Sequence, residues 1–146
     1  MSDTEIKQAM REFVAALTSG DADKALSYCT ESASWITPEG TFQGVEAMRR
    51  YVSWMGTTVT NVRFEDSGIG ILVQGDQAFY EHTFSGTYEG ETVQWAAVCA
   101  YEFSDGKIQR MRIAYDRLTI LQQAAKGWLE ETVVSSLVKR AEKGLH

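Results

Sequence analysis

The chain has 146 residues, the length of one ordinary domain with a buried core. Its 44% hydrophobic and 23% charged residues are typical of a folded globular protein and exclude a disordered chain. A formal net charge of −6 argues against a nucleic-acid partner, because neutralising phosphates requires a basic surface.

Cysteine and histidine are both scarce. Two cysteines, Cys29 and Cys99, are too few for a disulfide framework or a cysteine-rich metal site, and His82 and His146 are the only histidines. We therefore expect no metal and no cofactor. No apolar run has the length of a membrane span, and the polar opening MSDTEIKQ does not resemble a signal peptide. These features predict a cytoplasmic protein without a membrane partner.

The first third of the chain is predicted to be mainly helical. Apolar residues recur every three or four positions over 3–19, where Gly20 ends the pattern. A second short helix is expected over 21–29 and a third over 45–55, the latter between Gly44 and Gly56. The segment 33–36 is expected to be extended, with Pro38 ending it.

From residue 57 the period changes from helical to alternating. Strands are predicted over 60–66, 69–74, 77–88, 92–103 and 108–116, with turns at Gly68, Gly75–Asp76, Glu89–Gly90 and Asp105–Gly106. Residues 118–145 are helical again, with a break near Gly127. Helices followed by a meander of strands predict an α+β fold, in which a curved mixed or antiparallel sheet closes against the helices as a cone.

Several short strings occur in an order typical of a known family. They are Ser19-Gly20-Asp21, Trp35-x-Thr37-Pro38-x-Gly40, Gly44 to Met48, and the predicted hairpin from Phe103 to Asp116. With these strings the chain resembles the SnoaL-like and ketosteroid-isomerase-like branch of the nuclear transport factor 2 superfamily. The resemblance spans nearly the whole chain and implies one SnoaL-like domain over 1–146, of which 117–146 is a helical extension. It also implies a homodimer paired through the exposed face of the sheet.

At the positions where a ketosteroid isomerase has its acid groups and its tyrosine, this sequence has other residues. The position of its carboxylate base is Thr37, that of its helical tyrosine is Phe13, and that of its oxyanion-binding acid is Cys99. The acid of the related limonene-epoxide hydrolases falls near Ile113. The short sequence strings of SnoaL-like polyketide cyclases resemble those of this chain more closely. These enzymes use a His and an Asp to close a ring by an intramolecular aldol step.

Strand alternation predicts which side chains face the pocket. If Cys99 points inward, its neighbours at even spacing do so too, while Glu81, Glu102, Arg110, Arg112 and Asp116 point outward. The predicted lining is apolar and aromatic, which suits a hydrophobic small molecule. Its members are Phe13, Trp35, Thr37, Tyr80, Phe84, Trp95, Ala97, Cys99, Tyr101, Met111, Ile113 and Tyr115, together with His82.

His82 is the candidate catalytic residue, since its ordinary pKa lies near neutrality. The alternative is a histidine packed in the core and bonded to a backbone carbonyl or a tyrosine. Cys99 is interpreted as a small buried apolar residue, and Asp116 as a structural partner of Arg117 or Arg112. Three functions stay open: an isomerase-like or cyclase-like proton-transfer enzyme without a metal, a non-catalytic small-molecule-binding domain, and a protein–protein docking domain like nuclear transport factor 2 itself. The helix containing Trp128, Leu129, Val133 and Leu137 would pack on its own domain, cover the pocket mouth or contact another subunit.

Overall fold

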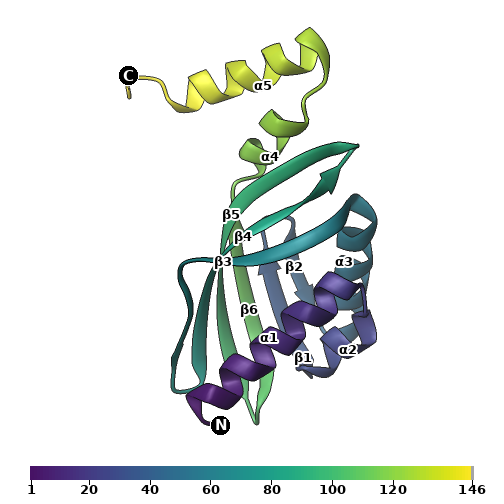
Figure 1. Ribbon diagram of the computed structural model, residues 1–146, viewed down its shortest axis with the longest axis vertical. Helices are drawn as coiled ribbons and strands as arrows, with labels where there is room; N and C mark the ends of the chain where they lie inside the picture. The colour runs from purple at the N-terminus through teal and green to yellow at the C-terminus, as the bar shows by residue number, and fades with distance from the viewer. Residues whose placement is uncertain (146) are drawn as a thin grey trace.

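The computed structural model describes residues 1–145 and contains helices packed on a curved, open sheet of six strands (Figure 1). In chain order the elements are α1 (Asp3–Ser19), α2 (Ala22–Ser27), β1 (Cys29–Thr37), β2 (Gly40–Gln43), α3 (Val45–Thr58), β3 (Val59–Gln74), β4 (Gln77–Tyr88), β5 (Glu91–Ser104), β6 (Lys107–Tyr115), α4 (Arg117–Ala124) and α5 (Gly127–Ala141). The predicted α+β class is confirmed. No helix within residues 1–145 is long and apolar enough to cross a membrane.

Helix α1 has the predicted boundaries because both of its ends are capped. The Ser2 hydroxyl accepts a hydrogen bond from the Glu5 backbone N–H at 3.3 Å, and the Glu5 carboxylate accepts one from the Ser2 N–H at 2.7 Å. Gly20 ends the helix with φ of +73°, a conformation that glycine adopts without steric cost. The buried stripe that includes Met10 and Phe13 then faces the sheet.

The sheet has the strand order β2-β1-β6-β5-β4-β3, and only the β1–β6 pair is parallel. Strand β1 is longer than the predicted segment 33–36, and α2 is shorter than predicted. Asp21 lies outside α2 as its N-cap, and Cys29 already pairs with Ile108 in the sheet. After Pro38 the chain reverses into β2, a short strand that the sequence pattern did not reveal.

The predicted turn at Gly68 was wrong, because β3 continues through it as one strand of 16 residues. Gly68 and Gly70 have φ of +53° and +60°, but pairing with β4 resumes at Ile71 after a register shift. The Ile69 N–H donates to the Glu81 carboxylate at 3.1 Å across this irregularity. The glycines therefore make a bulge that bends the strand instead of reversing it.

Two groups of buried residues make up the interior. The larger lies between the sheet and helices α1 to α3, and includes Met10, Phe13 and Trp35. The smaller lies toward α4 and includes Phe84, Val93, Trp95 and Ala124. The predicted break near Gly127 is present, since α4 ends at Ala124 and α5 begins at Gly127. Helix α5 projects beyond the sheet (Figure 1).

Candidate functional site

A cavity of about 470 Å³ lies between the concave face of the sheet and helices α1, α3 and α4. The structure brings all the predicted pocket residues except Thr37 to its wall, together with His82: Phe13, Trp35, Tyr80, Phe84, Trp95, Ala97, Cys99, Tyr101, Met111, Ile113 and Tyr115. Strands β4, β5 and β6 contribute most of these side chains because the register pairs inward positions with one another, as Tyr80 with Cys99 and His82 with Ala97.

Thr37 is not among the described residues that line this cavity, although its side chain lies beside that of Tyr51, which does. Its hydroxyl donates to the Gly40 carbonyl at 3.3 Å and accepts from the Glu39 N–H at 3.1 Å. The side chain is buried at the end of β1, where it stabilises the turn into β2. Strand alternation predicts the face on which a side chain lies but not its hydrogen bonds, so it did not reveal this structural role of Thr37.

His82 lies in the middle of β4 and is only 2% exposed. Its ring stacks on Tyr80, with centroids 4.4 Å apart and planes at 19°, and Phe64 lies on it at 5.4 Å. Burial lowers the pKa of His82, so the imidazole is neutral near pH 7. Its Nδ1 atom is buried and has no hydrogen-bond partner among residues 1–145. His82 is therefore a cavity-wall residue whose Nδ1 is a buried polar atom without a partner in the described part of the chain and without surface open to the cavity.

Tyr80 is held from the side by an ion pair. Its hydroxyl donates to the Asp66 carboxylate at 3.0 Å, and Arg11 forms two hydrogen bonds to the same carboxylate. The Arg11 guanidinium keeps the pKa of Asp66 below its ordinary value, whereas burial raises the pKa of Tyr80 to about 12. Tyr80 therefore stays protonated and fixed in position against His82.

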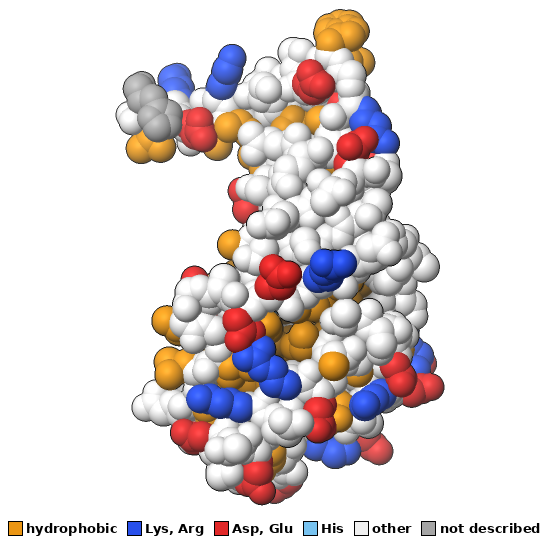
Figure 2. Space-filling model, viewed as in Figure 1, with side chains coloured by type: hydrophobic (Ala, Val, Ile, Leu, Met, Phe, Trp, Pro, Cys, Tyr) orange, Lys and Arg blue, Asp and Glu red, His pale blue; other side chains and the backbone are white. Residues whose placement is uncertain are grey.

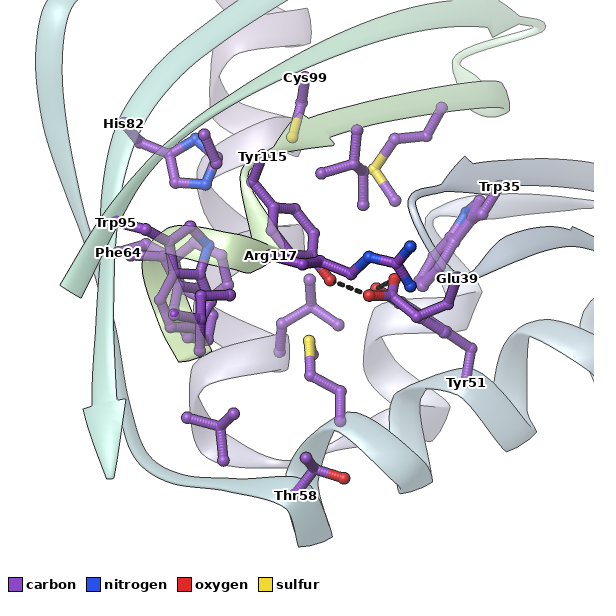
Figure 3. Close-up of a pocket in the computed structure, with 18 of the residues that line it drawn as sticks. Trp35, Glu39, Tyr51, Thr58, Phe64, His82, Trp95, Cys99, Tyr115 and Arg117 are labelled. Carbon is purple, nitrogen blue, oxygen red and sulfur yellow. Dashed lines mark hydrogen bonds between the residues drawn. The ribbon is translucent and has the colours of Figure 1, made fainter. Parts of the chain in front are cut away.

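Glu39 is a cavity residue that sequence reasoning missed. The Tyr115 hydroxyl donates to one oxygen of its carboxylate, and the Tyr51 hydroxyl donates to the other at 3.4 Å (Figure 3). Burial raises the pKa of both tyrosines, and the neighbouring carboxylate raises it further, so both act as donors. The available signal was Glu39 itself, one residue beyond the Thr37-Pro38 step, but strand alternation does not give side-chain directions within a turn.

Arg117, the first residue of α4, was also missed as a cavity residue. Its side chain lines the cavity and extends toward Glu39 in Figure 3. Glu39, Tyr51, Tyr115 and Arg117 place polar atoms along one part of the wall, and His82 contributes another from β4. The rest of the lining is mainly apolar and aromatic, so a ligand would be oriented by a few polar contacts.

The cysteines show no sign of nucleophilic reactivity. Burial raises the pKa of the Cys99 thiol, and likewise that of Cys29, to about 12. Both thiols are buried and stay protonated at neutral pH, in agreement with the interpretation of Cys99 as a small buried residue. No group of three His, Cys, Asp or Glu residues within 1–145 is arranged to hold a metal ion.

The charged residues predicted to point outward have partners away from the cavity. Glu102 forms ion pairs with Arg110 at 3.4 Å and Arg112 at 2.7 Å. Asp116 accepts from the Leu118 N–H at 2.8 Å and from the Thr119 hydroxyl at 2.8 Å. The expected partnership of Asp116 with an arginine was wrong, because this carboxylate is the N-cap of α4.

Comparison with known proteins identifies the family. A family model described as the SnoaL-like domain matches residues 10–111. The chain belongs to the SnoaL-like domain family. No curated protein matches it significantly in sequence. The match includes β1 to β5 and the first part of β6, and so covers most of the strand residues at the cavity.

Solved structures with the same fold share little sequence with this SnoaL-like domain. A candidate SnoaL-like polyketide cyclase from Jannaschia sp. CCS1 has a TM-score of 0.77 and 14% identity, over 88% of this chain and 98% of that one. A ketosteroid-isomerase-like protein from Catenulispora acidiphila DSM 44928, in complex with trimethylamine, has a TM-score of 0.74 and 15% identity over 82% and 93%. TerC co-crystallised with polyporic acid has a TM-score of 0.73 and 20% identity over 84% and 99%. At these identities the similarity shows a shared fold.

Proposed function

We propose that this SnoaL-like domain binds a largely apolar, flat small molecule in its cavity and that His82 transfers a proton to or from it. The observation that carries the proposal is the neutral imidazole of His82 at the wall of an aromatic cavity, where it stacks on Tyr80. Aromatic walls favour stacking on a flat ligand. Two structural neighbours support this class of ligand: one is a candidate polyketide cyclase, and the other was crystallised with polyporic acid.

The chemistry proposed for the site is acid–base catalysis without a metal, of an isomerase-like or cyclase-like kind. A neutral imidazole accepts a proton from a carbon or hydroxyl of the substrate and returns it at a second position. The Glu39 carboxylate, with its two tyrosine donors, supplies a second polar contact on the same cavity. A substrate with polar groups on an apolar frame would satisfy both sets of atoms.

The test compares turnover by the wild type with that by the H82Q and H146Q variants, on a panel of aromatic hydroxyketones and polyketide-like esters. H146Q is the matched control, because it changes the only other histidine in the sequence. We expect H82Q to lose turnover by about 10² to 10⁴-fold while H146Q retains it. Turnover by H82Q as fast as that by the wild type would remove His82 from the mechanism.

A second candidate is a non-catalytic binding domain of the same fold. It is favoured by Thr37, Phe13 and Cys99, which stand where the resemblance to ketosteroid isomerases implies a base, a donor and an acid. Saturable binding of a panel member, with the compound recovered unchanged after prolonged incubation, would support this candidate. Any His82-dependent conversion would reject it.

We further propose that the domain is a homodimer paired through the outer face of the sheet, as the resemblance implies, and that it is cytoplasmic. Outer-face residues Glu102, Arg110 and Arg112 provide charges of both signs for such a contact. The two unpaired cysteines suit a reducing compartment. Light scattering tests the dimer, and cell fractionation tests the location.

A further inference from the structure

Helix α5 lacks the buried face that packs an amphipathic helix against its own domain. It has 15 residues, none of which is buried, and it contacts α4. Val134 and Val138 are half-buried, while Leu129, Val133 and Leu137 are 60%, 53% and 49% exposed. Figure 2 shows hydrophobic side chains along this projecting part of the molecule. An isolated helix of this length is marginally stable in water, so packing elsewhere is needed to maintain it.

Three of the exposed apolar residues of α5 lie on one side of the helix, and the fourth, Trp128, lies on another side. Leu129, Val133 and Leu137 are four positions apart, which places them in a single stripe along the helix. Glu130 and Arg140 lie beside this stripe, one near each end of the helix. When two copies of this face meet in antiparallel orientation, the acidic group at the start of one helix lies opposite the basic group at the end of the other.

We propose that α5 pairs antiparallel with α5 of a second copy of this chain. A two-fold axis near residue 135 places Val133 of one copy against Leu137 of the other, and Glu130 against Arg140, in both directions at once. Such a contact is isologous, since each residue pair occurs twice. The apolar stripe loses its exposure to water, and the two charge pairs fix the antiparallel direction. This inference goes beyond the proposed function and does not depend on it.

The pairing has a consequence for the cavity. Leu118 and Leu121 of α4 line the cavity, and α4 is joined to α5 through Ala125 and Lys126. A second copy that holds α5 in place would therefore also hold the part of the cavity wall formed by α4.

The first experiment measures the mass of the full chain by size-exclusion chromatography with light scattering. A charge inside the apolar stripe, V133E, is expected to halve the mass of the wild type. E131K is the matched control, since Glu131 lies on another side of the helix. Circular dichroism and the melting temperature of V133E show whether the body of the domain is still folded. An unchanged mass for a folded V133E would overturn the proposal, because association would then not depend on the apolar stripe.

The second experiment uses charge reversal and is specific for the antiparallel geometry. E130K alone and R140E alone each place like charges at both ends of the pair, and each is expected to weaken association by about tenfold. An equimolar mixture of E130K and R140E chains restores opposite charges at both ends, so it is expected to associate as tightly as the wild type. Single variants that associate like E131K, or a mixture no tighter than its components, would contradict the antiparallel pair. Pairing through the sheet face alone gives neither the loss nor the recovery.

Discussion

The ring of Tyr80 stacks on the imidazole of His82, with centroids 4.4 Å apart, while the Tyr80 hydroxyl donates to Asp66 at 3.0 Å. These two contacts fix the plane of a histidine whose Nδ1 has no partner within residues 1–145. An imidazole fixed by its neighbours is oriented before a ligand arrives, which reduces the entropy lost on binding. The stacking therefore gives His82 a defined direction on the cavity wall.

Stability is expected to decrease as the pH falls below about 6.5, through His82. Burial lowers the pKa of this group in the folded protein, whereas the unfolded chain has the ordinary value of 6.5. The unfolded state then binds more protons, so the free energy of unfolding falls as the pH is lowered from 7 to 5. Urea denaturation at a series of pH values measures this. The decrease should be smaller in H82Q, and an equal decrease would show that His82 does not contribute to it.

Phe13 is expected to make a large contribution to stability. It is fully buried and packs edge-on against Trp35 at 5.7 Å and Tyr101 at 6.3 Å. F13A should lower the free energy of unfolding by about 3–5 kcal/mol, because it leaves a cavity, whereas F13L should cost less than about 1.5 kcal/mol. Denaturant titration distinguishes the two. Equal losses for both variants would mean that the aromatic contacts matter more than the filled volume.

The hydroxyl of Tyr115 is expected to stabilise the fold through Glu39. Y115F keeps the ring but removes the donor to this carboxylate, and it should cost about 1–2 kcal/mol. Y88F is the control, since Tyr88 also lines the cavity but makes no side-chain hydrogen bond within residues 1–145. It should change the free energy of unfolding by less than about 0.5 kcal/mol. A loss in Y115F no larger than in Y88F would argue against a stabilising bond to Glu39.

Asp116 is expected to act only as a helix cap. D116A should lower the free energy of unfolding by about 1 kcal/mol, and D116N should lower it much less, because the asparagine oxygen can still accept from the Leu118 N–H. Thermal denaturation measures both. If D116N abolished turnover while remaining fully folded, a catalytic role for Asp116 would have to be considered again.

Regular elements could be predicted because their sequence signals are local. Alternation along β4 placed both Tyr80 and His82 toward the interior, and the structure has them on the cavity wall. The bulge at Gly68 was not predictable in this way, since a positive φ serves a turn and a bulge equally well. Only the resumed pairing at Ile71, a long-range feature, distinguishes them.

The candidate site was predicted less completely than the sheet. Glu39 lies in a turn, where neither a period of 2 nor a period of 3.6 gives the direction of a side chain. Its position on the cavity depends on Tyr51 from α3 and Tyr115 from β6, which the fold brings to it from distant parts of the chain. Arg117 likewise reaches the wall only because Asp116 starts α4 at that point.

The most direct test of a ligand-binding cavity with His82 on its wall is an NMR titration of the imidazole C–H signals with bicyclic and tricyclic aromatic ketones and phenols. The account predicts that at least one compound shifts the His82 signals saturably, leaves the His146 signals unchanged, and no longer binds when A97W fills the cavity. The account would be contradicted if no compound shifted the His82 signals up to its solubility limit, or if the shifts persisted in A97W.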